Sequence, residues 1–383
     1  MPKESFQAKP QLNALTSLRF FAAFAIVILH ATNHGLLPAS WLHLLDWSKA
    51  VAFFFVLSGF VLTYAYAGRR YALRRFYQAR FARVWPATAA SILLVLILLP
   101  RGVYLPNDSS DWPLGFVLAS GLLGLQAWLP VPMVFFGINA VTWSISVEVA
   151  FYGFFPFLQR LPMRALLITL IGLMLIGAGA ANLVSFAKVP GFSPEHLNSQ
   201  VWQGWVYINP IARLPEFLIG IFAGNIFLSD FFQNMIKKWH FWAKRLFVLP
   251  DVVEFAAIAS LGWMGFRTQA WSFALPLQVV VNQWLSAIFF AGLLLVVAAG
   301  DRFSCRLLNW RPLVFLGEVS FGLYLYHQPL MIRASQSGGF SFAGVQLLPD
   351  SFFAVLAWSL LISFASYFWL EIPAQKWFRP KST

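Results

Sequence analysis

Charged residues and cysteine are scarce in this chain of 383 residues. Asp, Glu, Lys and Arg make up 11% of the sequence, whereas a soluble domain carries about a quarter. The single cysteine, Cys305, excludes an intramolecular disulfide and argues against a thiolate metal cluster. The sequence also lacks a glycine-rich phosphate loop, a zinc-ligand spacing and a Gly-x-Ser-x-Gly elbow. We therefore expect no metal and no permanently bound cofactor.

Apolar residues are correspondingly abundant, at 59% of the chain, and the mean hydropathy is +0.69. They form continuous runs rather than alternating patterns, which indicates membrane-spanning helices rather than a β-barrel. The net charge is +13, with 27 Lys and Arg against 14 Asp and Glu. The basic residues lie in loops between the apolar runs, a pattern typical of membrane topology rather than of nucleic-acid binding. The sequence predicts an all-α polytopic membrane protein forming one domain over residues 1–383.

Ten apolar segments are each near the length that crosses about 30 Å of hydrocarbon, so we expect ten transmembrane helices. They cover residues 15–34, 49–67, 84–100, 143–158, 165–184, 209–229, 252–267, 275–299, 313–333 and 350–371. A further apolar stretch, 114–128, is flanked by glycine and proline and is expected to be re-entrant or interfacial. The segments do not form two inverted halves, which weakens a transporter interpretation.

The charges of the loops predict the orientation. The loop after the second segment contains six arginines between residues 69 and 83, and no acidic residue occurs from Trp47 to Asn107. That loop and both termini are therefore expected on the cytoplasmic side of the inner membrane. The other basic loops agree only if 114–128 does not cross, which places Asp108 and Gly137 on the outer side.

Arg19 and His30 lie on the first apolar segment with ten residues between them. Eleven helical steps are roughly three turns, so both side chains lie on one face, about 16 Å apart along the axis. Ionisable groups inside a membrane segment are costly and mark candidate functional sites. The pair therefore suggests a polar path through the bilayer. The alternative is that Arg19 snorkels to the interface and His30 caps the other end of the helix.

Two features suggest a donor site near the cytoplasm. Ser58 and Gly59 interrupt a run of large apolar side chains, where either a ligand or another helix can approach closely. The following loop interleaves aromatic residues with a cluster of arginines that includes Arg69, Arg70, Arg74 and Arg75. Guanidinium groups match phosphate oxygens and aromatic faces can hold an adenine ring, so the surface suits a nucleotide carrier such as coenzyme A. The alternative is topology control with contacts to anionic lipid headgroups.

Glu148 begins an outer-leaflet segment that has no basic residue nearby in the sequence, and Tyr152 follows one turn later on the same face. Such a carboxylate must find a tertiary partner or be protonated. One function is to orient a histidine that acts as a general base. The alternative is a structural hydrogen bond between helices.

Two further polar groups are candidates for the acceptor side. Arg213 and Glu216 are three residues apart, so they either pair with each other or line an acceptor cleft. Tyr324 and His327 lie near one face of a later helix together with Ser320. Polar groups there are expected to face the bundle interior, although a single histidine in such a place is more often structural.

Six motifs, in order along nearly the whole chain, resemble those of the acyltransferase 3 family of membrane O-acyltransferases. They are Arg19 with His30, the Phe53–Leu62 stretch, the arginine-rich loop 69–83, Trp143–Glu148 with Phe151 and Tyr152, the Arg213–Gly220 stretch, and Ser320–Pro329. The resemblance implies a ten-helix core that moves an acyl group, usually acetyl, from cytoplasmic acyl-CoA to an extracytoplasmic hydroxyl. Acceptors in the family are commonly sugars of the cell surface, or small molecules.

This resemblance predicts a role for each candidate. The arginine loop, Arg19 and Ser58 would hold acyl-CoA, and the donor thioester would reach His30. His30, oriented by Glu148, would take the proton of the acceptor hydroxyl, or form an acyl-histidine. The remaining candidates would contact the acceptor; these are Arg213, Glu216, Tyr152, Tyr324 and His327. A chain ending at Thr383 would be of the stand-alone type. A transporter or flippase for an anionic lipid or sugar is the alternative function.

Overall fold

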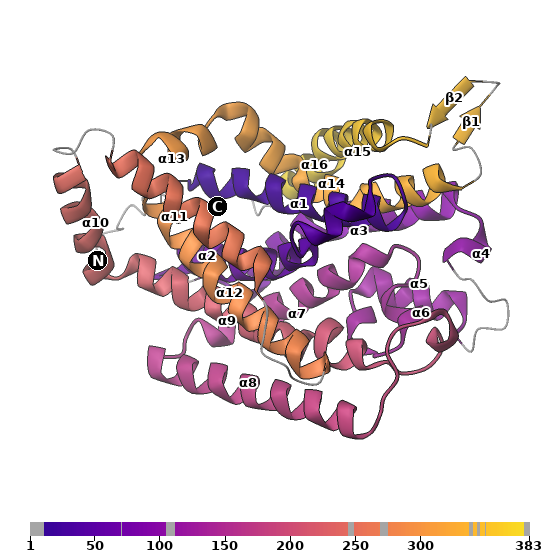
Figure 1. Cartoon of the computed structure of the whole chain (residues 1–383), viewed down its shortest axis with the longest axis horizontal. Coiled ribbons are helices and arrows are strands. Elements are labelled where there is room, and N and C mark those ends of the chain that lie inside the picture. Colours follow the sequence, from indigo (N-terminus) through magenta and orange to yellow (C-terminus); the bar gives the residue numbers. More distant parts are fainter. Residues whose placement is uncertain are drawn as a thin grey trace.

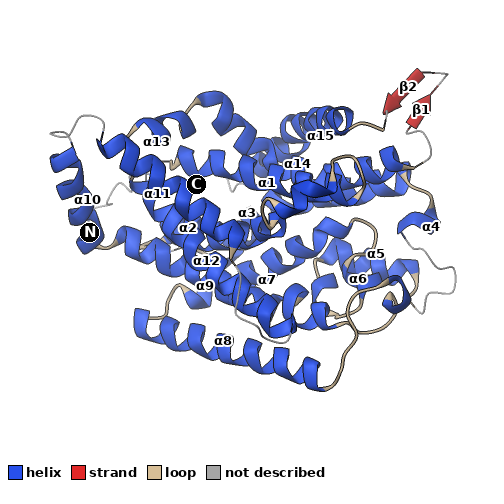
Figure 2. Ribbon diagram, in the orientation of Figure 1, coloured by secondary structure: helices blue, strands red, loops and turns tan. Residues whose placement is uncertain are grey.

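The computed structural model is a bundle of helices (Figure 2). It describes residues 11–69, 71–104, 112–243, 249–268, 275–336, 340–342, 345–348 and 350–378. Arg70 and Asp108 lie outside the described residues. The ten longest helices among the described residues are α1 (Asn13–Asn33), α2 (Ala50–Tyr66), α3 (Leu73–Leu98), α7 (Trp143–Leu158), α8 (Met163–Phe186), α9 (Pro210–Leu228), α11 (Leu249–Arg267), α12 (Leu275–Ala299), α14 (Arg311–Ser335) and α15 (Phe352–Ser366).

These helices occur at the ten positions expected from the apolar runs. Eight of them, taken with adjoining short turns, are long and apolar enough to cross a membrane. The other two are α11 and α14, which each contain three charged side chains. The prediction of an all-α, multi-pass membrane protein is confirmed, and ten crossings remain a prediction.

The start of α3 differs most from the expectation, because the helix begins at Leu73 rather than near residue 84. Residues 73–85 contain neither glycine nor proline and are rich in arginine and alanine, which favour helix. The apolar run marked only the part of the helix that suits hydrocarbon. Most of the expected arginine loop is therefore the first turns of α3.

Shorter elements gather at the two ends of the bundle (Figure 1). At one end lie α10 (Asp230–Ala243) and α13 (Phe303–Leu308). At the other end lie α4 (Arg101–Tyr104), α5 (Leu114–Leu123), α6 (Pro132–Phe135) and an antiparallel hairpin of β1 (Phe340–Phe342) and β2 (Val345–Leu348). A last short helix, α16 (Ile372–Phe378), follows α15 through a π turn at Tyr367–Glu371.

Helix α5 occupies the segment that was expected not to cross. It has ten residues, which span about 15 Å, half of the hydrocarbon thickness. It ends at Gly124, whose φ of +67° is the left-handed conformation that glycine adopts without strain. The chain then continues through short turns to α6, so no single helix covers 114–128.

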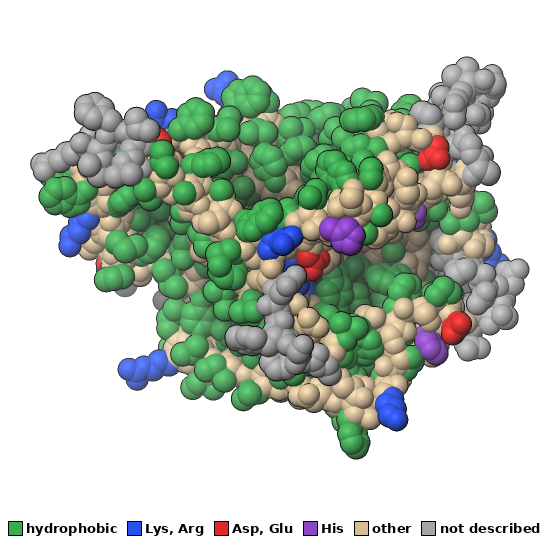
Figure 3. Space-filling model, in the orientation of Figure 1, with side chains coloured by type: hydrophobic (Ala, Val, Ile, Leu, Met, Phe, Trp, Pro, Cys, Tyr) green, Lys and Arg blue, Asp and Glu red, His purple; other side chains and the backbone are tan. Residues whose placement is uncertain are grey.

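Small residues bring the central helices together. A Cβ atom added to Gly59 of α2 would lie 2.2 Å from the carbonyl oxygen of Phe217 in α9, so the two backbones are in direct contact there. Peripheral helices instead present apolar side chains outward, as at Ile168 (71% exposed) and Phe186 (87%) of α8. Apolar side chains also cover most of the face shown in Figure 3. This distribution suits a protein surrounded by lipid.

Candidate active site

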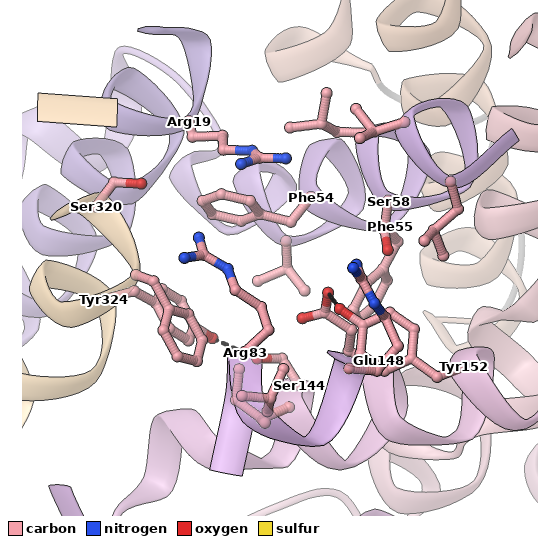
Figure 4. A pocket seen from close by; sticks show the side chains of 18 residues that line it. Arg19, Phe54, Phe55, Ser58, Arg83, Ser144, Glu148, Tyr152, Ser320 and Tyr324 are labelled. Carbon is pink, nitrogen blue, oxygen red and sulfur yellow. Dashed lines mark hydrogen bonds between the residues drawn. The ribbon is translucent and has the colours of Figure 1, made fainter. Parts of the chain in front are cut away.

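A cavity of about 130 Å³ lies between α1, α2, α3, α7 and α14 (Figure 4). Apolar side chains of α2, including Phe54 and Phe55, form much of its wall. The polar side chains that line it are those of Arg19, Ser58, Arg80, Arg83, Ser144, Glu148, Tyr152, Ser320 and Tyr324. The cavity therefore collects charged groups from three separate helices, α1, α3 and α7, inside the bundle.

Positive charge exceeds negative charge around this cavity, since Arg19, Arg80 and Arg83 meet one carboxylate, that of Glu148. Arg19 and Arg83 extend into the same space from α1 and α3 (Figure 4). Arg83 also reaches the buried carboxylate of Glu371, with an Nη1–Oε2 distance of 3.5 Å. The surplus of guanidinium groups suits an anionic ligand or a ligand with a polarised carbonyl.

Glu148 receives a hydrogen bond from the hydroxyl of Tyr152, one turn further along α7. The guanidinium of Arg80 lies over the Tyr152 ring, 5.7 Å from its centroid. The carboxylate, the phenol and the cation therefore form one connected group on the wall shared by α3 and α7.

The size of the cavity limits what it can hold. Pockets for drug-sized ligands measure roughly 300–1,000 Å³, so 130 Å³ is too small for a whole nucleotide carrier. A narrow, extended part of a ligand fits this volume better. Arg74 and Arg75 are exposed at the start of α3, and Arg69 is partly exposed just before it. These arginines do not line the cavity and lie at the N-terminal end of α3.

Ser58 and Gly59 have separate surroundings. Ser58 lines the cavity, whereas Gly59 packs against the backbone of α9. The helix-packing interpretation therefore holds for Gly59, and a ligand contact at Ser58 stays a prediction. Arg80 and Arg83 were counted in the arginine loop but were not singled out as site residues. Their spacing of three residues places them on one face of a helix. This spacing is informative only because α3 starts at Leu73, so that both residues are helical.

His30 belongs to a second polar group that adjoins the cavity. Its Nδ1 atom lies 2.8 Å from Nε2 of His327, and the two rings stack with centroids 5.0 Å apart. His327 is completely buried and His30 is partly exposed. The ring of Tyr324, which lines the cavity, lies 6.2 Å from that of His327. Tyr324 thus stands between the arginine-lined cavity and the histidine pair.

The expected contact between His30 and Glu148 was wrong. Glu148 is hydrogen-bonded to Tyr152 on its own helix and faces the arginines of α3, whereas His30 is hydrogen-bonded to His327 of α14. The reason is the packing of the helices, because α14 rather than α7 lies along α1 at the level of His30. His327 was expected to contact the acceptor, and the structure instead places it against His30.

Arg213 and Glu216 pair with each other, one of the two alternatives that the sequence allowed. The Arg213 Nε and Glu216 Oε2 atoms are 2.9 Å apart, and the side chains are 1% and 0% exposed. The guanidinium lies among the rings of Phe55, Trp143 and Tyr207, with centroids at 5.1, 5.9 and 4.8 Å. Neither residue lines the arginine-lined cavity.

No group of three His, Cys, Asp or Glu side chains is placed to hold a metal ion in the described part of the chain. The polar groups that the structure brings together here are guanidinium, carboxylate, hydroxyl and imidazole groups. The histidine pair offers a base and the cavity offers a site for an anion.

Comparisons with known proteins agree with this chemistry. The chain is 29% identical over 339 residues to the acyltransferase MdmB of Streptomyces mycarofaciens, covering 83% of this chain and 78% of that protein. It is 24% identical to the O-acetyltransferase OatA of Staphylococcus aureus, covering 86% of this chain and 52% of OatA. It is also 24% identical to the putative peptidoglycan O-acetyltransferase YrhL of Bacillus subtilis, covering 84% of this chain and 49% of YrhL.

The chain thus spans about half the length of OatA and YrhL. No solved structure matches it. The model of the acyltransferase 3 family, described as an acyltransferase domain, matches residues 12–368. Because this match covers most of the sequence, the chain belongs to the acyltransferase 3 family.

Proposed function

We propose that this protein is a membrane O-acyltransferase that uses cytoplasmic acyl-CoA to acylate a hydroxyl group on the opposite side of the membrane. The observation that carries the proposal is an arginine-lined cavity which adjoins a histidine pair inside a bundle of apolar helices. An anion site and a base are the two functions that such a transfer requires.

The donor would enter from the end of the bundle that holds α10 and α13. That end carries Lys237, Lys238, Arg302 and Arg306, and the positive-inside rule supports its location in the cytoplasm, with both termini there. Arg69, Arg74 and Arg75 would meet the nucleotide phosphates outside the cavity, and we extend this role to Arg70. The cavity would receive the narrow thioester arm, in contact with Arg19, Ser58, Arg80 and Arg83.

His30 would act as the general base. The acceptor oxygen attacks the thioester carbon as His30 takes the hydroxyl proton, the C–S bond breaks, and the CoA thiolate leaves and regains a proton from His30. An acyl-histidine formed on His30 is a second route to the same products. Tyr324 separates the cavity from the histidine pair, so the acyl group would pass this side chain.

Glu148 and Tyr152 have a revised role in this proposal. Because Glu148 supplies the one carboxylate among the described residues that line the cavity, it would balance the arginines and hold Tyr152 toward the substrate. Arg213 and Glu216 would support the outer part of α2 and α7 through the aromatic rings around Arg213. They would not contact the substrate directly.

The acceptor would be a sugar hydroxyl of the cell envelope and the acyl group acetyl. The support is that two relatives are named O-acetyltransferases, one of them a putative peptidoglycan O-acetyltransferase. The protein would then lie in the cytoplasmic membrane with ten crossings, and α5 would remain on the outer side.

Purified protein in detergent tests the proposal. We expect it to bind CoA and to release free thiol from acetyl-CoA when a glycan acceptor is added, and His30→Ala to bind CoA but release no thiol. A flippase of anionic lipid or sugar is the alternative, favoured by the basic cavity inside the bundle. It would show no CoA binding and no thioester cleavage, and that result would exclude the acyltransferase.

A further inference from the structure

Three groups in a row connect α1 to the backbone of α14. The Nδ1 atom of His30 lies 2.8 Å from Nε2 of His327. The Nδ1 atom of His327 lies 2.9 Å from the carbonyl oxygen of Leu323, one turn earlier in its own helix. The two imidazole planes are 13° apart. His30, His327 and the Leu323 carbonyl therefore form a continuous hydrogen-bonded line that ends on a backbone acceptor.

The backbone end of this line determines where the protons are. A carbonyl oxygen can only accept, so His327 must carry its proton on Nδ1. In a neutral His327 the Nε2 atom is then a bare acceptor, and the hydrogen bond to it requires the proton of His30 on Nδ1. The Nε2 atom of His30 is consequently left with a free lone pair. Leu323 thus selects the tautomer of a side chain on another helix.

In the described part of the chain, the side-chain hydrogen bonds of the pair are the one between the two rings and the one to the Leu323 carbonyl. His327 is completely buried, so only the partly exposed His30 can meet a substrate. The Tyr324 hydroxyl is occupied by Ser144 at 2.7 Å and by the carbonyl oxygen of Val141 at 3.1 Å. Another histidine, His34, follows one turn after His30 at the end of α1, where its amide bonds to the His30 carbonyl.

We propose that His327 is the positioning residue for His30, fixing the tautomer in which Nε2 is the base. When Nε2 of His30 takes the acceptor proton, its Nδ1–H donates to His327, which shares the positive charge. The proton returns to the leaving thiolate from the same Nε2 atom, so His327 gains none overall. The inference rests on the proposed function, because it names the group that orients the base of that reaction.

Two substitutions of similar size separate the two hydrogen bonds of His327. In His327→Gln the side-chain amide reaches the position of Nε2, where its oxygen can accept from His30. In His327→Asn the shorter amide lies near the position of Nδ1, so it keeps the bond to Leu323 but loses His30. His240→Gln is the matched control, because that histidine lies on α10 and bonds to the carbonyl oxygen of Ala299.

We expect His327→Asn to lower kcat by about ten- to a hundredfold, the value of one charge-assisted hydrogen bond, with unchanged KM for acyl-CoA. His327→Gln should keep most of the kcat that His327→Asn loses, and His240→Gln should have the kcat of the unaltered protein. Equal losses in the Gln and Asn variants, or full activity of the Asn variant, would overturn the proposal.

Nitrogen NMR of protein labelled with ¹⁵N-histidine tests the tautomer without relying on activity or on a stable variant. We expect the proton of His30 on Nδ1 and a bare Nε2 in the unaltered protein, and a mixture of tautomers in His327→Asn. A proton on Nε2 of His30 would overturn the inference. A correct tautomer in a protein that cleaves no acyl-CoA would instead disprove the proposed function alone.

Discussion

Arg19 and His30 lie on one helix, eleven residues apart, yet they belong to two different polar groups. Arg19 lines the cavity with Arg80 and Arg83, whereas His30 is hydrogen-bonded to His327. Tyr324 lies between the two groups. This separation suggests that binding of the donor and activation of the acceptor are performed by different side chains, so substitutions should affect them independently.

The arginines should divide into those inside the cavity and those outside it. Arg19→Ala and Arg80→Ala should each weaken CoA binding by about ten- to a hundredfold, since a hydrogen bond to a charged group contributes about 1.5–3 kcal/mol. The double variant Arg74→Ala/Arg75→Ala should lose less CoA affinity, because exposed charges are screened by solvent. Calorimetric titration with CoA measures each value, with the exposed Arg164→Ala as the control. Equal affinities throughout the set would contradict a donor site in this cavity.

Removal of the carboxylate from the cavity should strengthen donor binding. Glu148→Gln keeps an oxygen that can accept the hydrogen bond from Tyr152, so we expect the variant to fold. The cavity then presents its arginines without an opposing charge. We expect CoA affinity to rise severalfold in the same titration. Weaker binding would show that Glu148 contacts the donor favourably rather than balancing the arginines.

Ser58 and Gly59 should respond differently to alanine. At Gly59 the added Cβ atom would lie 2.2 Å from the Phe217 carbonyl oxygen, so α2 and α9 must separate and the protein should lose about 1–3 kcal/mol of stability. Ser58→Ala should leave stability nearly unchanged and weaken donor binding. Thermal unfolding and CoA titration of both variants provide the comparison. An unaltered melting temperature for Gly59→Ala would contradict the close contact between these helices.

The native Cys305 should not interfere with mapping the membrane topology by labelling of introduced cysteines. Its side chain is fully buried, and burial together with the nearby Glu254 carboxylate raises the pKa of the thiol to about 12. The thiol is therefore protonated at neutral pH, and we expect no labelling of the unaltered protein by maleimide.

Cysteines introduced at the exposed positions Gly102 and Glu195 should then be labelled from one side, and one at Lys237 from the other. Helices α7 and α8 separate the first two sites, and α9 separates the last two. Labelling of Gly102→Cys and Glu195→Cys from opposite sides would mean that the segment containing α5 crosses the membrane.

The positions of the long helices could be predicted because each is a continuous apolar run of spanning length. Helix α3 began earlier than expected because residues near 73–83 are charged, and hydrophobicity cannot detect helix outside the hydrocarbon. Tyr152 was placed correctly beside Glu148 because both lie on one helix, where spacing gives the contact.

Contacts between helices could not be predicted in the same way. The sequence offered Glu148 as the partner of His30 and placed His327 on the acceptor side, whereas the packing of α1 against α14 pairs His30 with His327. Arg213 has its ion-pair partner three residues away, but the rings that surround it come from other elements of the fold. Spacing along one helix is thus informative, whereas the choice between helices depends on the whole bundle.

Acyl transfer in vesicles of known orientation tests the central claim most directly. Acetyl-CoA is supplied on the side of α10 and α13 and a glycan acceptor on the other, and acetylated product is measured for the unaltered protein and for His30→Ala. We expect product from the unaltered protein only when the substrates are on opposite sides in this order, and none from His30→Ala. Product formed only when both substrates share one side, or near-normal product from His30→Ala, would contradict the account.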